Sequence, residues 1–595
     1  MISADLQVSR LFRLQQALKD HHADGLVVPR VDCYQGEYVA LCDERLAWLT
    51  GFNGSAGMAI VLTNRACLFV DGRYTLQANQ QVLTDRVDVR SRTSSSIRDW
   101  LMECIEPGST LLYDPWLHTH QQFKELQNIV SDLGCNLKAC VINPIDTVWD
   151  DRPTPPLSLV RTHPIEWSGE ESQSKRQKIS YILNKVKADA LVLTSPESIA
   201  WLLNLRGQDV PHTPISHAFV IVKSDTNVEV FINMKKVTTE VVEYCGYNVE
   251  WFPQESFMDI LQQLSEKRVL VDPYQVPQKV VNILQASGAK IIFEDDPCIL
   301  LRSVKNTTEL RGAHAAHKRD AVALVNFFAW LLKSIETQEV TELEASLHLK
   351  AERQKQPLFQ DLSFVTISSV GSNGAIIHYH PTRESDRILT KDNLYLVDSG
   401  GQYLDGTTDV TRTLAIGQPT EEQKDRYTRV LKGHIALATT IFPVGTNGQQ
   451  LDVLARQYLW QVGLDYEHGT GHGVGSYLSV HEGPHRISKY ASFTPLQPGM
   501  IVSNEPGYYK PGEYGIRIEN LVTVVKLPFI GEHPMLGFEN LTLVPFDKKL
   551  IDVSMLSKTE REWIDTYHHK VWEALSPLVG SETIDWLKVA TEPLG

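Results

Sequence analysis

The sequence predicts an α/β protein in which two related α/β domains are followed by a larger α+β domain and a short helical extension. Three features indicate this architecture: an internal repeat in the N-terminal half, a proline-rich break between the two copies, and a long mixed pattern of helices and strands after a second break. At 595 residues the chain is too long for one core, since a domain usually holds about 100–200 residues.

The internal repeat consists of an amphipathic helical pattern, the dipeptide Ala-Asp and a short apolar run suited to a buried strand. It occurs at residues 11–28 and again at 178–193. A second matching pair, "LAWLTGFNGSAGMAIVL" at 46–62 and "IAWLLNLRGQDVPHTPISHAFVIV" at 199–222, follows each copy in the same order. We therefore expect two domains of the same fold in tandem.

Two breaks define the limits of the domains. The segment "DDRPTPPLSL" at 150–159 contains prolines that resist both helix and sheet. The segment "SVKNTTEL" at 303–310 precedes a long helical pattern. The predicted units are an N-terminal α/β domain at 1–150, a related α/β domain at 160–304, a third, larger domain at 305–548 and a helical extension at 549–595.

The C-terminal extension begins with a helix signal. Ser557 and Glu560 have the spacing of a capping box, in which each residue's side chain bonds the backbone of the other. We expect the helix that follows to pack on the body of the protein through Trp563 and Trp572.

Composition and charge exclude several classes of partner. The formal net charge is −15, so no basic surface is expected to bind nucleic acid. No segment contains 18 consecutive apolar residues, and the first 20 residues lack the apolar core of a signal peptide. The eight cysteines show no metal-binding spacing, and none follows Cys298. These features predict a cytoplasmic protein with reduced cysteines and no membrane association.

The stretch "HGTGHGVGSYLSVHEGPH" at 468–485 contains four histidines. His468 and His472 have the spacing of a zinc-binding helix, but the interleaved glycines would each cost a helix about 1 kcal/mol. We therefore expect a loop or an irregular strand, in which glycine lets the backbone approach a buried site closely.

Four carboxylates stand in strand-like segments and could complete a metal site. Asp398 and Asp409 lie in two apolar runs separated by turn residues around Leu404, so a hairpin would bring them together. Glu505 ends an apolar strand. Arg517 and Glu519 alternate with two isoleucines, so both are expected to point to the same side of another strand.

A set of four carboxylates and one imidazole suits manganese, cobalt or iron better than structural zinc. The carboxylate charge predicts two divalent ions, because one ion would leave several buried charges unbalanced. Two such ions can share a water molecule, lower its pKa and polarise a carbonyl group.

The motifs "DGTTDVTRT", "HGTGHGVG", "VHEGP", "NEPGYY" and "GIRIEN", in this order, resemble those of the pita-bread metallopeptidases. This group includes methionine aminopeptidase, prolidase, creatinase and aminopeptidase P. Segments such as "LTGFNGSAG", "DRPTPP" and "SKTEREWIDTYHHKVWE" extend the resemblance to the long cytosolic form of aminopeptidase P over nearly the whole chain. The resemblance implies two creatinase-N-like domains before a pita-bread catalytic domain.

The resemblance also implies a site and a reaction. Asp398 would bind one metal, Asp409 and Glu519 would bridge both, and His472 and Glu505 would complete the other. His378, His468, His481 and Arg517 would contact the substrate or stabilise the transition state, and Glu505 would also shuttle a proton. The ions would be Mn²⁺, with cobalt, iron or zinc as alternatives. The implied reaction is hydrolysis of an N-terminal Xaa-Pro bond by a metal-bridging hydroxide.

Several alternatives stay open at this point. Arg517 could merely orient Glu519 by an ion pair, and His485 could be a surface or supporting residue. The specificity could be that of a prolidase or a methionine aminopeptidase, and the same fold also serves as a non-catalytic module that binds peptides or histones. The resemblance favours short peptides with proline in the second position as substrates and a homodimer as the assembly.

Overall fold

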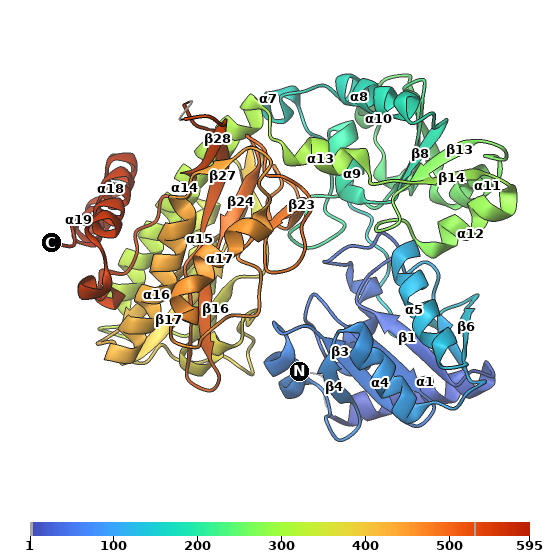
Figure 1. Cartoon of the computed structure of the whole chain (residues 1–595), viewed down its shortest axis with the longest axis horizontal. Coiled ribbons are helices and arrows are strands. Elements are labelled where there is room, and N and C mark those ends of the chain that lie inside the picture. The colour runs from blue at the N-terminus through green and yellow to red at the C-terminus, as the bar shows by residue number, and fades with distance from the viewer. Residues whose placement is uncertain (1–3, 529–530) are drawn as a thin grey trace. The chain divides into compact units, whose positions relative to one another are not determined.

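The computed structural model describes residues 4–528 and 531–595. The chain forms two compact units (Figure 1). Among the described residues, the first unit contains those up to 164 and 170–299, and the second contains 165–169 and those from 300 onward. No helix in the described part of the chain has the length and apolar character needed to cross a membrane.

The first unit contains two six-stranded mixed sheets. The strands of the first, in the order β4-β3-β2-β1-β5-β6, are β1 (Gly25–Pro29), β2 (Met58–Leu62), β3 (Ala66–Val70), β4 (Asp88–Ser91), β5 (Thr110–Tyr113) and β6 (Asn136–Ala139). The strands of the second, in the order β12-β11-β10-β8-β13-β14, are β8 (Ala190–Leu193), β10 (Phe219–Lys223), β11 (Val228–Ile232), β12 (Val249–Pro253), β13 (Arg268–Val271) and β14 (Lys290–Phe293).

The two sheets have the same topology. In each, the central strand that follows Ala-Asp, β1 or β8, pairs antiparallel with the next long strand and parallel with a later one. Each is preceded by an amphipathic helix, α1 (Ala4–Asp20) or α8 (Ser172–Lys185). The predicted tandem repeat of one α/β fold is therefore confirmed.

Short helices complete the first unit. They are α2 (Arg45–Thr50), α3 (Thr75–Gln81), α4 (Ser94–Cys104), α5 (His120–Asp132), α6 (Pro144–Val148), α9 (Pro196–Leu203), α10 (Thr239–Cys245), α11 (Phe257–Gln262) and α12 (Gln278–Ser287). Helix α13 (Pro297–Ser303) begins in the first unit and ends in the second. Apolar side chains on both faces of the first sheet form two clusters of buried residues, and the second sheet has a core of its own.

The second unit combines long helices with antiparallel sheets. The helices are α14 (Thr307–Ser334), α15 (Glu342–Gln354), α16 (Glu421–Ala438) and α17 (Gly448–Trp460), and they lie along the strands of this unit (Figure 1). Each begins at a capping box, for example Asn306 with Glu309 in α14. Such caps bond the backbone N–H groups that have no partner within the helix.

Two sheets of this unit carry the candidate site. One has the order β16-β17-β20 and the other β21-β28-β27-β24-β22-β23. Their strands are β16 (Ile367–Val370), β17 (Asn393–Ser399), β20 (Val410–Ile416), β21 (Phe442–Pro443), β22 (Gly471–Gly473), β23 (Glu482–Ile487), β24 (Ile501–Asn504), β27 (Asn520–Lys526) and β28 (Met535–Asn540). The hairpin of β25 (Gly507–Lys510) and β26 (Tyr514–Arg517) forms a separate two-stranded sheet.

The C-terminal extension packs on this unit through α18 (Lys558–Leu575) and α19 (Ser581–Thr591). Ser557 and Glu560 form the expected capping box at the start of α18. Trp563 and Trp572 are partly buried against the core of the unit, so the predicted packing of this helix is confirmed.

Candidate metal centre

Asp398 and Asp409 are positioned by neighbouring antiparallel strands. Asp398 is near the end of β17, opposite Thr411 of β20, and Asp409 immediately precedes β20. The chain between them folds back through β18 (Gly401–Tyr403) and β19 (Gly406–Thr407). This arrangement is the hairpin that the sequence predicts.

His472 and Glu505 come from adjacent strands of the other sheet. His472 is the central residue of β22, and Glu505 directly follows β24, which pairs with β22. The backbone N–H of Glu505 donates to the carbonyl of Thr470 at 2.8 Å. The glycine-rich stretch is thus a short strand at this position, which agrees with the exclusion of a helix.

The expectation of one continuous strand through Arg517 and Glu519 is wrong. Strand β26 ends at Arg517, β27 begins at Asn520, and the two belong to different sheets. Between them the N–H of Ile518 donates to the carbonyl of Pro506, and that of Glu519 donates to the carbonyl of Thr411. This change of partner brings Glu519 beside Thr411, whose hydroxyl donates to Oε2 of Glu519 at 2.9 Å.

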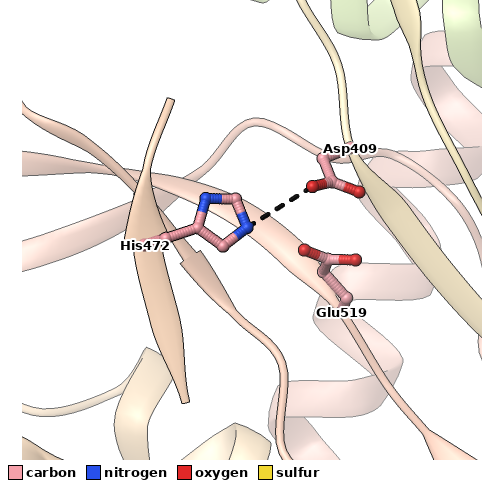
Figure 2. Close-up of side chains that lie close together, drawn as sticks. All are labelled: Asp409, His472 and Glu519. Atoms are coloured by element: carbon pink, nitrogen blue, oxygen red, sulfur yellow. Dashed lines mark ion pairs between the residues drawn. The ribbon is translucent and has the colours of Figure 1, made fainter. Parts of the chain in front are cut away.

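Asp409, His472 and Glu519 form a compact cluster (Figure 2). One potential ligand atom from each lies within 4.8 Å of the other two. Nε2 of His472 lies 3.5 Å from Oδ2 of Asp409 and 3.7 Å from Oε1 of Glu505. Nδ1 of His472 donates to the carbonyl of Gly473 at 2.9 Å. Because that nitrogen carries the proton, a neutral His472 presents the lone pair of Nε2 to the carboxylates.

The donor atoms of the cluster fit a divalent metal. Two buried oxygens of the cluster, Oδ1 of Asp409 and Oε1 of Glu519, have no hydrogen-bond partner among the described residues, and neither does Oδ1 of Asp398, which lies outside the cluster. A buried carboxylate without a partner is strongly unfavourable unless a cation balances it. Oxygen ligands with one imidazole form a donor set typical of divalent ions such as manganese.

The carboxylates raise one another's pKa. Burial, followed by the charges of Asp398 and Glu505, raises the pKa of Asp409 well above its usual range. Burial and the charge of Asp409 do the same to the pKa of Glu519. Burial also raises the pKa of Glu505, against the opposing influence of His472. The metal-free site therefore concentrates negative charge away from water, which favours cation binding.

Arg517 connects this site to neighbouring side chains. Its Nη2 donates to Oδ2 of Asp398 at 2.7 Å, and its Nη1 donates to the hydroxyl of Tyr509 at 2.6 Å. Tyr509 lies 2.8 Å from Nε2 of His468. The ion pair of Arg517 is thus with Asp398 and not with Glu519, although Thr411 contacts both Arg517 and Glu519. Tyr509 was not singled out from the sequence, where only its place in "EPGYY" pointed to it.

The other predicted histidines lie at different distances from the cluster. Nδ1 of His468 is 3.9 Å from Oε2 of Glu505, and the ring of His481 packs edge-on against His472 with 4.4 Å between centroids. His378 is partly buried next to Ile377, whose carbonyl accepts a hydrogen bond from Arg517. The structure therefore brings His468, His472 and His481 to one place, with His378 beside the Arg517 network.

His485 is not a surface residue. It is buried, and its Nε2 donates to the carbonyl of Ile501 at 2.7 Å. Its position on β23 faces inward, as do those of Glu482 and Ile487. Of the two alternatives, the supporting role is therefore the one that agrees with its burial.

Comparison with known proteins shows matches along the whole chain. The Creatinase/Prolidase N-terminal domain matches residues 10–141 and, in a second form, residues 151–309. Metallopeptidase family M24 matches residues 311–526, and the C-terminal region of peptidase M24 matches residues 534–594. The matches fall on the two repeated sheets, the unit with the carboxylate cluster and the terminal helices.

Individual relatives share this full arrangement. A probable Xaa-Pro aminopeptidase P of Paracoccidioides brasiliensis is 41% identical over 98% of this chain and 99% of its own length. Aminopeptidase P2 of Arabidopsis thaliana is 39% identical over 96% of this chain and 86% of its own. The crystal structure of X-prolyl aminopeptidase from Caenorhabditis elegans, described as a cytosolic enzyme with a di-nuclear active site, has a TM-score of 0.94 at 31% identity and covers 99% of this chain and 100% of that one.

Proposed function

Because this chain belongs to metallopeptidase family M24, with relatives named Xaa-Pro aminopeptidase over nearly its full length, we propose that it releases the first residue of peptides whose second residue is proline. The observation that carries this proposal is the cluster of Asp409, His472 and Glu519 beside Asp398, where one oxygen of each carboxylate has no hydrogen-bond partner within the described part of the chain. The chain is accordingly a dinuclear metallo-aminopeptidase.

Five residues would hold the ions: Asp398, Asp409, His472, Glu505 and Glu519. By the family resemblance, Asp409 and Glu519 would contact both ions, and their ligand atoms lie within 4.8 Å of each other and of His472. When bound, two divalent ions supply a water of lowered pKa and polarise the scissile carbonyl. The oxygen-rich donor set favours Mn²⁺, with cobalt, iron or zinc as alternatives.

The charges of the site support the same chemistry. Two divalent ions neutralise the four carboxylates, and the buried guanidinium of Arg517 then leaves one excess positive charge. An excess of positive charge in a buried site stabilises an anionic nucleophile and a developing oxyanion.

The side chains of the chain perform the proton transfers and orient the substrate. Glu505 takes a proton from the attacking water and delivers one to the proline nitrogen, which has no N–H of its own. His378 donates a hydrogen bond to the oxyanion. His468 is oriented through Tyr509, which Arg517 fixes. His481, packed against His472, contributes with Arg517 to the pocket for proline.

We further propose that the chain acts in the cytoplasm as a homodimer and that it is divided into four domains at the limits given above. The described C. elegans relative is a cytosolic enzyme. A mass of one chain in solution at micromolar concentration would contradict the dimer.

Two alternatives are less well supported. A non-catalytic peptide-binding module would be expected to lack metal ligands, yet all five ligand positions are occupied by suitable residues. A methionine aminopeptidase would be expected to lack the two N-terminal domains, and a prolidase to have one, whereas relatives of this chain match it over both.

Release of the first residue from Arg-Pro-Pro tests the proposal, with Arg-Ala-Pro and Met-Ala-Ser as matched peptides. Each is measured before chelation, after chelation and after addition of manganese. We expect cleavage of Arg-Pro-Pro alone, lost on chelation and restored by manganese. Cleavage of Arg-Ala-Pro or Met-Ala-Ser at a similar rate would refute the proline specificity. A metal-loaded protein that cleaves none of them would support the binding module.

A further inference from the structure

The segment that carries His468 and His472 needs support from outside itself. Residues 468–475 contain four glycines, and glycine leaves the backbone more freedom than any other residue. His468 and Glu505 nevertheless have to keep fixed positions for proton transfer. The groups that hold this backbone therefore decide how well the site is organised.

One arginine bonds the backbone at the start of this segment and just before it. Arg456, on the buried face of α17, is 0% exposed. Its Nη2 donates to the carbonyl of His468 at 2.8 Å, and its Nη1 donates to the carbonyl of Tyr466 at 2.7 Å. Its guanidinium also lies 3.8 Å from the centroid of the Tyr466 ring. The planar, permanently charged guanidinium can bond several acceptors at fixed angles, which a lysine ammonium cannot do.

Asp452, one helical turn earlier, extends the contact toward Glu505. Its Oδ2 accepts the Nε–H of Arg456 at 2.7 Å. Its Oδ1 accepts the hydroxyl of Thr470 at 2.5 Å. The carbonyl of Thr470 in turn accepts the backbone N–H of Glu505 at 2.8 Å. A single ion pair on α17 is thus connected by hydrogen bonds to the backbones of both His468 and Glu505.

We propose that Arg456, together with Asp452, is the positioning residue of the active site, and that it sets the places of His468 and Glu505 without contacting the substrate. This inference rests on the proposed peptidase function, because it assigns His468 and Glu505 to that reaction. Within the described part of the chain, the hydrogen bonds of Arg456 go to other residues than the five candidate ligands. Arg456 therefore does not hold a ligand side chain directly.

A second buried ion pair in the same unit provides a matched control. Arg353 is also 0% exposed and donates two hydrogen bonds to Asp320, at 2.7 and 3.0 Å. Within the described residues its hydrogen bonds are to Asp320 and not to residues 465–473. Asp409 is near enough to influence the pKa of Arg353, and lysine at position 353 keeps the positive charge there. If Arg456 served only to stabilise the fold, substitution of either arginine by lysine would have the same consequences.

The test compares Arg456→Lys and Arg353→Lys with the wild-type enzyme. Three quantities are measured: kcat and KM for Arg-Pro-Pro with saturating manganese, bound metal per chain, and backbone hydrogen–deuterium exchange of a peptide spanning 464–473. For Arg456→Lys we expect kcat to fall by about 10- to 100-fold, as for a small misplacement of reacting groups. We expect KM to change little and exchange at 464–473 to accelerate. Because Glu505 is also a candidate ligand, kcat is expressed per metal-loaded chain, and it should fall on that basis too. Arg353→Lys should leave kcat and this exchange close to wild type.

A second variant, which leaves the buried charges unchanged, tests the proposal if Arg456→Lys does not fold. Thr470→Val removes the bond to Asp452 and the contact with the hydroxyl of Tyr466 while keeping the size of the side chain, and it should lower kcat in the same direction with faster exchange at 464–473. Equal behaviour of Arg456→Lys and Arg353→Lys in kcat and exchange, or a Thr470→Val variant like the wild type in both, would overturn the proposal. A wild-type protein without peptidase activity would refute the proposed function. The exchange measurement needs no substrate, so it would still show whether Arg456 holds this segment in place.

Discussion

Asp398 and Arg517 form a buried ion pair in which Nη2 of Arg517 lies 2.7 Å from Oδ2 of Asp398. The pair leaves Oδ1 of Asp398 without a hydrogen-bond partner among the described residues. Burial alone would lower the pKa of Arg517, but Tyr509 and Asp398 outweigh that influence and raise it. Arg517 is therefore charged at all relevant pH values, and it orients Asp398 with one oxygen toward the metal site.

Breaking this pair should destabilise the protein. In Arg517→Met the carboxylate of Asp398 remains buried without its partner, which typically costs about 3–5 kcal/mol. We expect urea unfolding of the metal-free variant to give a free energy of unfolding lower by that amount. Arg517→Lys keeps the charge and should lose less. An Arg517→Met protein as stable as the wild type would show that the pair contributes nothing.

The crowded carboxylates predict the opposite effect for Asp409→Asn. Folding raises the pKa of Asp409 above its unfolded value of 3.8. Such a group contributes stability that is fully present below the unfolded pKa and is lost as pH rises through the folded pKa. At neutral pH the unfolded wild type has an ionised Asp409, while the folded metal-free site disfavours the ionised form, so folding has a free-energy cost that the asparagine variant lacks.

We expect metal-free Asp409→Asn to be about 1 kcal/mol more stable than metal-free wild type at pH 7, with the difference shrinking toward pH 4. Thermal or urea unfolding across this range, in the presence of a chelator, measures it. A metal-free variant that is less stable than the wild type at pH 7 would contradict the assignment of a raised pKa to Asp409.

Buried histidines predict a loss of stability in acid. Burial lowers the pKa of His485 from 6.5 to about 4. A depressed pKa on a base means that its contribution is fully present above the unfolded pKa of 6.5 and is lost as pH falls toward 4. His485→Gln can still donate to the carbonyl of Ile501, and it removes the titration. We expect the free energy of unfolding to fall between pH 6.5 and 4 less steeply in the variant, by up to about 1.4 kcal/mol for each pH unit. Identical slopes would disprove this role.

The role of Glu505 in proton transfer can be tested separately from its role as a metal ligand. Glu505→Gln keeps an oxygen at the candidate ligand position but cannot accept a proton. We expect kcat for Arg-Pro-Pro to fall by about 10²- to 10⁴-fold, with at least part of the metal retained. The measurement is kcat at saturating manganese together with bound metal. A variant with an unchanged kcat would exclude Glu505 as the carrier.

The candidate ligands could be singled out from the sequence because each is an acidic or imidazole group in a strand-like or glycine-rich segment, and two of them, His472 and Glu505, stand beside glycine or proline. The hairpin around Leu404 and the repeat of the two α/β domains could be predicted for a similar reason, since periodicity and turn residues are local signals. The break between Arg517 and Asn520 could not, because alternation along the chain does not reveal that the backbone changes its hydrogen-bonding partner from one sheet to another.

The roles of the residues that support the site could not be predicted from the sequence either. Tyr509, Thr411 and Arg456 are common residue types at ordinary positions in strands and a helix. Their contacts join segments far apart in the chain, as between Thr411 and Glu519, which are 108 residues apart. Nothing in the local pattern distinguished the buried His485 from a surface histidine, because its orientation depends on which face of β23 packs inward.

The most direct test of the dinuclear site is the number of manganese ions bound per chain in wild type, Asp409→Ala and Glu519→Ala, measured after chelation and reloading, with Arg-Pro-Pro cleavage followed on the same samples. Two ions in the wild type, with both metal and turnover lost in each variant, is the predicted result because these carboxylates would contact both ions. A wild type that binds one ion or none, or a variant that keeps two ions and the wild-type rate, would contradict the site described here.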